Sequence, residues 1–247
     1  MKEAADLYAL FYSSCYFILK YEVFFKVKKI FIACFMVFVL CACKSDAVKT
    51  EIKCKEYEEP GYRVLIEVPE FEGDSEFVKK LNEEYIALSE NIFMNFKKEA
   101  ELSEINNDTL ELYQYIKTNR AGILSIIGEC EAYTGGAHGT LSRVVKNLDM
   151  AGERELLLDD FFVDGEYKNR INSYIEFMME EKPSEFRELW KKPSVGEKQG
   201  FYINDKGIVI FYPPYELSYY SKGFIEIEIP HDELRGYLKP EYSAIWE

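Results

Sequence analysis

The apolar residues between positions 62 and 96 change their spacing once, and this change constrains the fold more than any other feature of the sequence. At first they alternate with polar residues, as in a strand with one buried face: Tyr62, Val64, Ile66 and Val68. They then recur every three or four residues, as on one face of a long helix that Asp74 or Ser75 can cap: Phe77, Leu81, Tyr85, Leu88, Ile92 and Phe96. We therefore expect a sheet packed against an amphipathic helix.

Later segments repeat these two patterns. Strands are expected over residues 110–117, 122–133, 141–148, 201–203, 208–212 and 224–229. Helices are expected over residues 167–181 and 185–190. Asn204-Asp205-Lys206-Gly207 is typical of a hairpin turn between two of the strands. The sequence thus predicts an α+β fold in which mostly antiparallel sheets pack against amphipathic helices.

The composition permits a large core and restricts the partners. Of the 247 residues, 48% are hydrophobic and 16% are aromatic, which excludes a disordered chain. The formal net charge is -14, so nucleic acid is not an expected partner, because binding to its phosphates needs a cationic face. An acidic surface instead attracts cationic partners.

The amino-terminal region has the features of an export signal. Three lysines precede an uninterrupted apolar run over residues 30–42, which is shorter than the roughly 20 residues of a membrane span. The run ends in Leu40-Cys41-Ala42-Cys43, which resembles the bacterial lipobox. We therefore expect a lipoprotein signal peptide within residues 1–42, and a lipid on Cys43 that anchors the body in the bacterial cell envelope, outside the cytoplasm. The alternatives are a plain secreted protein and an uncleaved anchor.

Residues 1–26 do not fit this signal, because a second apolar stretch precedes the basic residues. We interpret Val27 as the true start; otherwise residues 7–40 would form a helical hairpin in the membrane. Removal of residues 1–42 takes away five basic and three acidic residues, so the net charge changes from -14 to -16. The charged residues 43–59 are expected to be a flexible tether that leads into the folded body.

The segment Tyr133-Thr134-Gly135-Gly136-Ala137-His138-Gly139 has two readings. Gly135 and Gly136 suit the central positions of a primed hairpin turn, since glycine adopts positive φ without steric cost. In the functional reading, the turn lets the backbone approach a partner while Tyr133, Thr134 and His138 present a small polar cluster. A second segment, Tyr215-Glu216-Leu217-Ser218-Tyr219-Tyr220, is either a set of aromatic rings packed under a loop or a recognition surface.

Leu158-Asp159-Asp160-Phe161-Phe162 predicts a short helix with Asp159 at its N-cap. Adjacent carboxylates also suit acid and base chemistry or a metal, but only with a further ligand, and the sequence supplies none at a useful spacing. We therefore expect capping at this position, and neither a metal nor a cofactor in the protein.

Cys54 and Cys130 are the two cysteines that remain in the body once Cys43 is acylated. In an oxidising compartment they are candidates for a disulfide. The alternative is that Cys130 is a buried free thiol, because it lies on the apolar face of the strand over residues 122–133.

Several separated motifs, taken in order, resemble one family. They are the segment 133–139, the segment 158–162, Phe201-Tyr202 with Gly207-Ile208-Val209-Ile210, Tyr215-Glu216 followed by Gly223, and Ile229-Pro230. They span about residues 60–236 and are similar to the extracytoplasmic module of unknown function shared by the anti-sigma factor RsiV, a lysozyme receptor, and the N-terminal part of the peptidoglycan deacetylase PdaC. The resemblance implies two consecutive α+β subdomains, residues 60–149 and residues 150–247.

The resemblance also implies a non-enzymatic binding protein that recognises a cell-envelope or lysozyme-like partner. Two departures from the family, the stretch 218–222 and His231, concern ligand preference at one edge of the second subdomain. The alternative is an envelope glycan hydrolase or deacetylase-associated module in which His138 works with Glu216 or Asp159 as acid and base. A structural spacer is a third reading. The candidate ligand-binding residues are Tyr133, Thr134, Gly135, Gly136, His138, Tyr215, Glu216 and Tyr219.

Overall fold

The computed structural model describes residues 47–104 and 107–247. The predicted leader, the start at Val27 and the lipidation of Cys43 lie outside the described residues. Among the helices of these two ranges, none combines the length and the apolar character that crossing a membrane requires.

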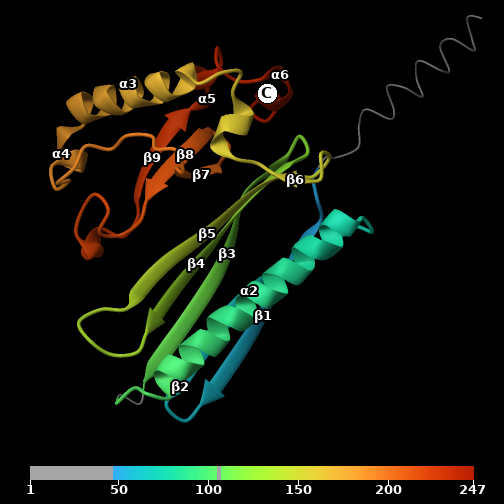
Figure 1. Cartoon of the computed structure of the whole chain (residues 1–247), viewed down its shortest axis with the longest axis vertical. Helices are drawn as coiled ribbons and strands as arrows, with labels where there is room; N and C mark the ends of the chain where they lie inside the picture. The colour runs from blue at the N-terminus through green and yellow to red at the C-terminus, as the bar shows by residue number, and fades with distance from the viewer. Residues whose placement is uncertain (1–46, 105–106) are drawn as a thin grey trace, which may run out of the picture. The chain divides into compact units, whose positions relative to one another are not determined.

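The first half of the described chain forms a six-stranded sheet with the strands in sequence order (Figure 1). Neighbouring strands are antiparallel, except that β2 and β3 are parallel because a long helix, α2 (Glu76–Ala100), connects them. The strands are β1 (Thr50–Glu59), β2 (Tyr62–Phe71), β3 (Asp108–Arg120), β4 (Ile123–Tyr133), β5 (Thr140–Asp149) and β6 (Arg154–Glu155).

Helix α2 packs on one face of this sheet, as its apolar stripe predicts (Figure 1). Ser75, not Asp74, caps the helix: its side chain accepts a hydrogen bond from the Val78 amide at 3.2 Å. Side chains from the inner faces of the strands and from the helix stripe form one apolar core, which includes Val64, Ile66, Leu81, Tyr85, Leu110 and Leu124.

The expected tether through residue 59 is wrong, because Thr50–Glu59 pairs along its whole length with β2. Just before β1, the Asn119 side chain holds the Val48 backbone through two hydrogen bonds of 2.8 and 2.7 Å. The charge of this stretch does not make it flexible. Charged side chains are also typical of a strand at the edge of a sheet, where they discourage pairing with other chains.

The second half contains a smaller antiparallel sheet of three strands, β7 (Gly200–Ile203), β8 (Gly207–Tyr212) and β9 (Ile225–Pro230). The predicted turn between β7 and β8 is confirmed, since the Asn204 amide donates to the Gly207 carbonyl at 3.0 Å. One long helix and five short helical segments complete this half: α3 (Glu166–Glu181), α4 (Pro183–Phe186), α5 (His231–Leu234), α6 (Pro240–Ser243), η1 (Leu158–Phe161) and η2 (Tyr220–Lys222).

The α+β prediction is confirmed, and the two sheets are joined by buried polar side chains. Strand β7 is an edge strand whose outer backbone groups bond to the face of the larger sheet. The Ile203 amide donates to Ser125 Oγ at 3.1 Å, and Asn147 Nδ2 donates to the Phe201 carbonyl at 3.0 Å. Ser125 and Asn147 are themselves bonded at 2.7 Å. The Ile203 amide and the Phe201 carbonyl of this edge therefore have partners in the interior.

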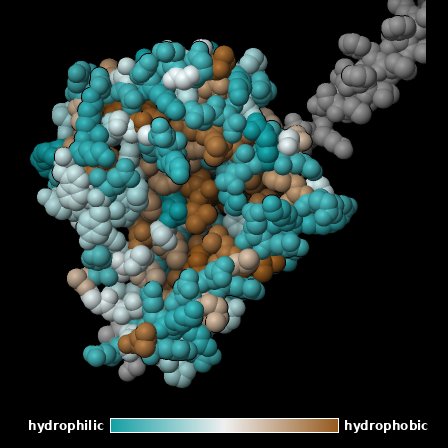
Figure 2. All heavy atoms as spheres, in the orientation of Figure 1, coloured by the Kyte–Doolittle hydropathy of each residue, from teal (hydrophilic) through white to brown (hydrophobic). Residues whose placement is uncertain are grey.

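Figure 2 shows hydrophilic residues over most of the viewed face, with apolar residues gathered in a hollow near its middle. The predominance of hydrophilic residues agrees with the acidic composition of the chain.

Candidate functional site

The loop between β4 and β5 carries the first set of predicted site residues. Its two central glycines have positive φ, 103° at Gly135 and 91° at Gly136. The predicted two-residue primed turn is nevertheless wrong, because strand pairing ends at Ala132 and Thr140 and leaves a longer loop. The strands approach closely at Gly139, where a Cβ would lie 2.6 Å from the Ala132 carbonyl oxygen. Within the loop, the Tyr133 hydroxyl donates to the Gly136 carbonyl at 3.1 Å.

His138 joins this loop to the aromatic segment that lies 77 residues further along the chain. Its Nδ1 lies 2.8 Å from the Gly139 carbonyl oxygen, and its Nε2 lies 3.0 Å from the Tyr215 hydroxyl. A carbonyl only accepts, so Nδ1 carries the proton of the neutral ring, and Tyr215 donates to Nε2. The imidazole also stacks on the Tyr220 ring at 3.9 Å. The two predicted segments therefore form one surface, which we call the aromatic cluster: His138, Trp190, Tyr215, Tyr219 and Tyr220.

Tyr215 has an unusual backbone conformation within this cluster. Its φ is 69°, a left-handed value that non-glycine residues adopt at an energetic cost, and such residues occur preferentially at functional sites. Tyr215 lies inside a turn in which the Glu216 amide donates to the Pro213 carbonyl at 3.1 Å. The Tyr215 ring remains 58% exposed, so the strained backbone presents an aromatic side chain to solvent.

Trp190 belongs to the cluster, although it is not among the predicted site residues. Its indole nitrogen donates to the Glu216 carbonyl at 3.3 Å, and its ring meets the edge of Tyr219 at 5.2 Å. The sequence predicts a helix over residues 185–190, whereas α4 ends at Phe186, so Trp190 lies beyond the helix. The signal that could have identified Trp190 is its position next to charged residues, where a tryptophan is often exposed.

The aromatic segment divides into a buried and an exposed part. Leu217 and Ser218 are buried, and Ser218 Oγ donates to the Glu188 carbonyl at 2.9 Å. Tyr219 is 61% exposed and Trp190 is 53% exposed. The buried residues anchor the exposed rings, so Tyr215 and Tyr219 are not packed under the loop, and recognition by this surface stays a prediction.

Charged groups surround the cluster. Glu188 forms an ion pair with Lys222, and this hydrogen bond lowers the pKa of the Glu188 carboxyl. Burial raises the pKa of the Tyr220 hydroxyl, and the nearby Glu131 carboxylate raises it further. Tyr220 therefore stays neutral beneath the His138 ring at physiological pH.

The carboxylates proposed for catalysis are not hydrogen-bond partners of His138. Asp159 accepts a hydrogen bond from the Tyr167 hydroxyl and forms an ion pair with Lys168 at 3.1 Å. The bond from Tyr167 lowers the pKa of the Asp159 carboxyl most, and the contact with Lys168 lowers it further. The predicted N-cap role of Asp159 is wrong, because Asp160 instead accepts from the Leu157 amide at 2.8 Å. Glu216 is exposed, and its carbonyl, not its carboxylate, contacts the cluster.

Thr134 meets a different neighbour. Its carbonyl accepts a hydrogen bond from the Ser103 hydroxyl at 3.4 Å, and this contact ties the base of the loop to the chain that follows α2. Thr134 therefore supports the loop and is not among the residues that contact His138.

The predicted Cys54–Cys130 disulfide is absent, since both thiols are free in the structure. Cys54 is on β1 and Cys130 is on β4, with β2 and β3 between them in the sheet. Three strand spacings of about 4.8 Å place the two Cα atoms far beyond the roughly 7 Å that a disulfide spans. Burial raises the pKa of the Cys130 thiol to about 11, as expected for an inert structural cysteine.

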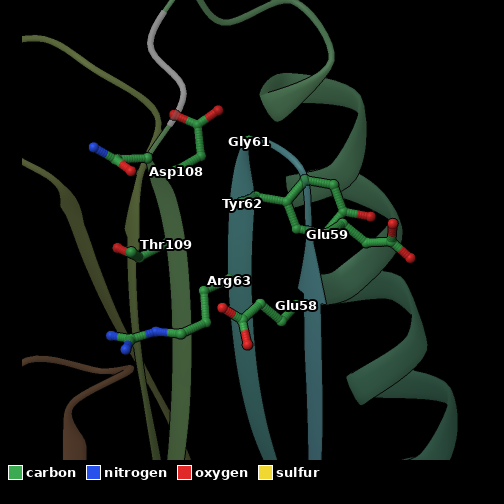
Figure 3. Close-up of a pocket in the computed structure, with 8 residues that line it drawn as sticks. Glu58, Glu59, Gly61, Tyr62, Arg63, Asp108 and Thr109 are labelled. Carbon is green, nitrogen blue, oxygen red and sulfur yellow. The ribbon is translucent and has the colours of Figure 1, made fainter.

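A pocket of about 370 Å³ lies at the end of β1, β2 and β3 (Figure 3). Its walls carry the carboxylates of Glu58, Glu59 and Asp108 and the guanidinium of Arg63. Arg63 extends across β3 toward Glu111, 3.5 Å away, and not toward Glu58. Within the described ranges, no group of three or more His, Cys, Asp or Glu side chains is arranged to hold a metal ion. The pocket carries no feature that selects a ligand.

The comparison with protein families concerns the second half of the chain. Residues 159–232 match the family described as "Protein of unknown function (DUF3298)". This part of the chain is a DUF3298 domain. It contains α3, all three strands of the smaller sheet and every residue of the aromatic cluster except His138, which comes from the loop between β4 and β5.

Two solved DUF3298 family proteins share the fold. One is from Bacteroides fragilis NCTC 9343, with 17% identity and a TM-score of 0.58; the similarity covers 80% of this chain and 96% of that one. The other is from Pseudomonas aeruginosa PAO1, with 20% identity and a TM-score of 0.58; the similarity covers 80% of this chain and 97% of that one. No curated protein matches the chain. The structural similarity extends well beyond the DUF3298 domain, so the six-stranded sheet belongs to the shared fold.

Proposed function

We propose that this chain is a lipid-anchored protein outside the cytoplasm that binds a cell-envelope or lysozyme-like partner through the aromatic cluster, without catalysing a reaction on it. The observation that carries the proposal is the contact between His138 and Tyr215, which joins two distant segments into one exposed surface.

The exposed rings suit protein recognition. Tyr215, Tyr219 and Trp190 are each more than half exposed, and side chains of this kind dominate the binding energy of many interfaces. The cluster is also preorganised, because the hydrogen bonds of Tyr215 to His138 and of Trp190 to the Glu216 carbonyl already hold two of the rings. Rings that are held in place before binding lose little conformational entropy when a partner arrives.

The charge of the chain favours a cationic partner. Its net charge is -14, and it becomes -16 without the predicted leader. Opposite charge accelerates the encounter, and salt weakens this effect. The resemblance of the separated motifs to the extracytoplasmic module of RsiV, a lysozyme receptor, and of PdaC adds a lysozyme-like protein as a specific candidate.

The contacts of His138 support recognition over acid and base catalysis. Both ring nitrogens are engaged, one by a backbone carbonyl and one by a phenol, and neither partner is a carboxylate. A general base of a hydrolase is usually oriented by an acidic or comparable group and left open toward the substrate.

The test measures binding of the chain without residues 1–42 to lysozyme and to muropeptides at low salt. Tyr215→Ala is expected to weaken binding more than about tenfold, as for a central interface aromatic. Tyr115→Ala is the matched control, because Tyr115 is an exposed tyrosine on β3 outside the cluster. The proposal would be contradicted if the chain bound neither lysozyme nor muropeptides. It would also be contradicted if Tyr215→Ala and Tyr115→Ala lost equal amounts of binding affinity. A turnover of glycan that His138→Ala abolishes would establish the catalytic alternative instead.

A further inference from the structure

One stretch of β5 has an open edge. The strand pairs with β4 along its length, but with β6 only at Leu148 and Asp149. Two hydrogen bonds show which residues face outward: the Met150 amide bonds to Gly122 on the β4 side, and the Asn147 carbonyl bonds to Leu156 on the other. Because backbone groups alternate along a strand, the odd-numbered residues face away from β4. These are Leu141, Arg143 and Val145, and their amides and carbonyls make no hydrogen bond to the described part of the chain.

The opposite edge of the sheet, β1, is protected in the usual way. Its exposed side chains are mostly charged, including Lys53, Lys55, Glu56 and Glu58. Charges along an edge strand discourage the addition of another strand.

Strand β5 lacks this protection, because both of its central cations are occupied. The Arg143 side chain is 6% exposed; it binds Glu129 and Glu226 and lies 4.0 Å from the centre of the Phe224 ring. Lys146 forms ion pairs with Glu84 at 3.2 Å and with Glu155 at 2.9 Å. The exposed side chains in this stretch are neutral: Thr140, Ser142 and Val144.

The two faces beside this edge differ in chemistry. Val144 is 37% exposed on the face that carries α2, next to the uncharged Ser142 two residues away. On the opposite face, Glu129 and Glu226 bind Arg143, and Glu131 lies on β4 opposite Leu141. A strand added here would place alternate side chains against an uncharged face that includes Val144 and against an acidic face.

We propose that the edge of β5 from Leu141 to Val145 is a docking site for an extended segment of a partner protein in which apolar and basic residues alternate. The backbone of that segment pairs with the three open residues, as in recognition by strand addition. Its basic side chains meet the carboxylates of Glu131 and Glu226, and its apolar side chains cover Val144. This site adjoins the aromatic cluster, because Glu131 also lies near Tyr220, but the proposal does not depend on the proposed function.

The test uses the full chain and a synthetic peptide of alternating lysine and valine. Binding is expected to protect the amides of Leu141, Arg143 and Val145 from hydrogen exchange. Val145→Pro removes one outward amide and leaves every bond to β4 intact, so we expect about tenfold weaker binding. Leu141→Pro makes the same change at the other end of the site, and circular dichroism checks that each variant folds.

Two controls separate strand pairing from attraction between charges. Cys54→Pro removes an outward amide from β1 and is expected to bind the peptide as tightly as the parent protein does. The Glu72 amide donates to the Lys49 carbonyl, so odd-numbered residues of β1 face β2 and even-numbered residues such as Cys54 face outward. A peptide of the same charge, N-methylated on alternate residues, is expected not to bind. Equal binding of the methylated peptide or undiminished binding by both folded proline variants would overturn the proposal. A dimer that forms through β5 without the peptide would assign the edge to a second copy of the chain and would also overturn it.

Discussion

The two halves of the described chain build their cores in different ways. In the first half, the buried apolar residues lie on regular elements, such as Ile66 on β2, Leu81 on α2 and Leu124 on β4. In the second half, which includes the DUF3298 domain, many buried residues lie in irregular segments and single helical turns: Leu156, Leu158, Phe161, Phe162, Leu217, Leu234, Leu238, Tyr242 and Ile245. Local periodicity therefore specifies the first core, whereas contacts between distant irregular segments complete the second.

Substitution of Phe161 has the largest effect on stability that we expect from this difference between the two cores. It is fully buried in η1, next to Phe201 of β7 and Tyr242 of α6, and its carbonyl accepts from the Lys239 amide at 2.9 Å. Phe161→Ala is expected to lower the free energy of unfolding by about 3 to 5 kcal/mol, through lost burial and the cavity that remains. Denaturant unfolding measures this change.

Val163→Ala is the matched control, since Val163 is an exposed residue two positions later in the same irregular stretch. Its expected effect lies within about 0.5 kcal/mol. Similar effects of the two substitutions would break the comparison, because they would show that η1 is not part of the second core.

Asn147→Ala tests whether the two halves unfold together. The substitution leaves the Phe201 carbonyl without its buried donor and the Ser125 hydroxyl proton without its buried acceptor, at an expected cost of about 1 to 3 kcal/mol. The two tryptophans, Trp190 and Trp246, are both in the second half, so fluorescence follows that half while circular dichroism follows both. The two transitions are expected to coincide in the parent protein and to separate in the variant.

Thr140→Ala, at the exposed start of β5, is the control for this measurement and is expected to leave the transitions together. Coincident transitions in Asn147→Ala would mean that the apolar contacts among Ile127, Tyr202 and Val209 hold the halves together without the polar joint.

The same difference explains what the sequence could predict. The stripe of α2, the alternation of β2 and the turn after Ile203 are local patterns, and the structure confirms them. The bond between His138 and Tyr215 crosses 77 residues, and no local period encodes such a contact. Its two partners were identified separately, from residue chemistry alone.

Two errors have a common physical cause. The charged β1 was assigned to a tether, and the β4–β5 loop was assigned to a two-residue turn. In both segments, the local composition is compatible with two conformations, and the pairing of strands decides which of the two forms. Edges and loops therefore need tertiary information that the interior strands do not.

Asp159 gives the smallest expected effect and tests how the irregular start of the DUF3298 domain is held to α3. The hydrogen bond from Tyr167, and then the contact with Lys168, lowers the pKa of this carboxyl in the folded state. The resulting stabilisation is present above the unfolded pKa of about 3.9 and is lost as the pH falls through the folded value. Asp159→Asn is therefore expected to lower stability at neutral pH by less than about 1 kcal/mol, because the carboxylate is largely exposed. Glu180→Gln changes the same charge at an exposed position of α3, and the difference between the two variants should vanish in acid. A difference that persists below the folded pKa would assign the effect of Asp159 to packing and not to its charge.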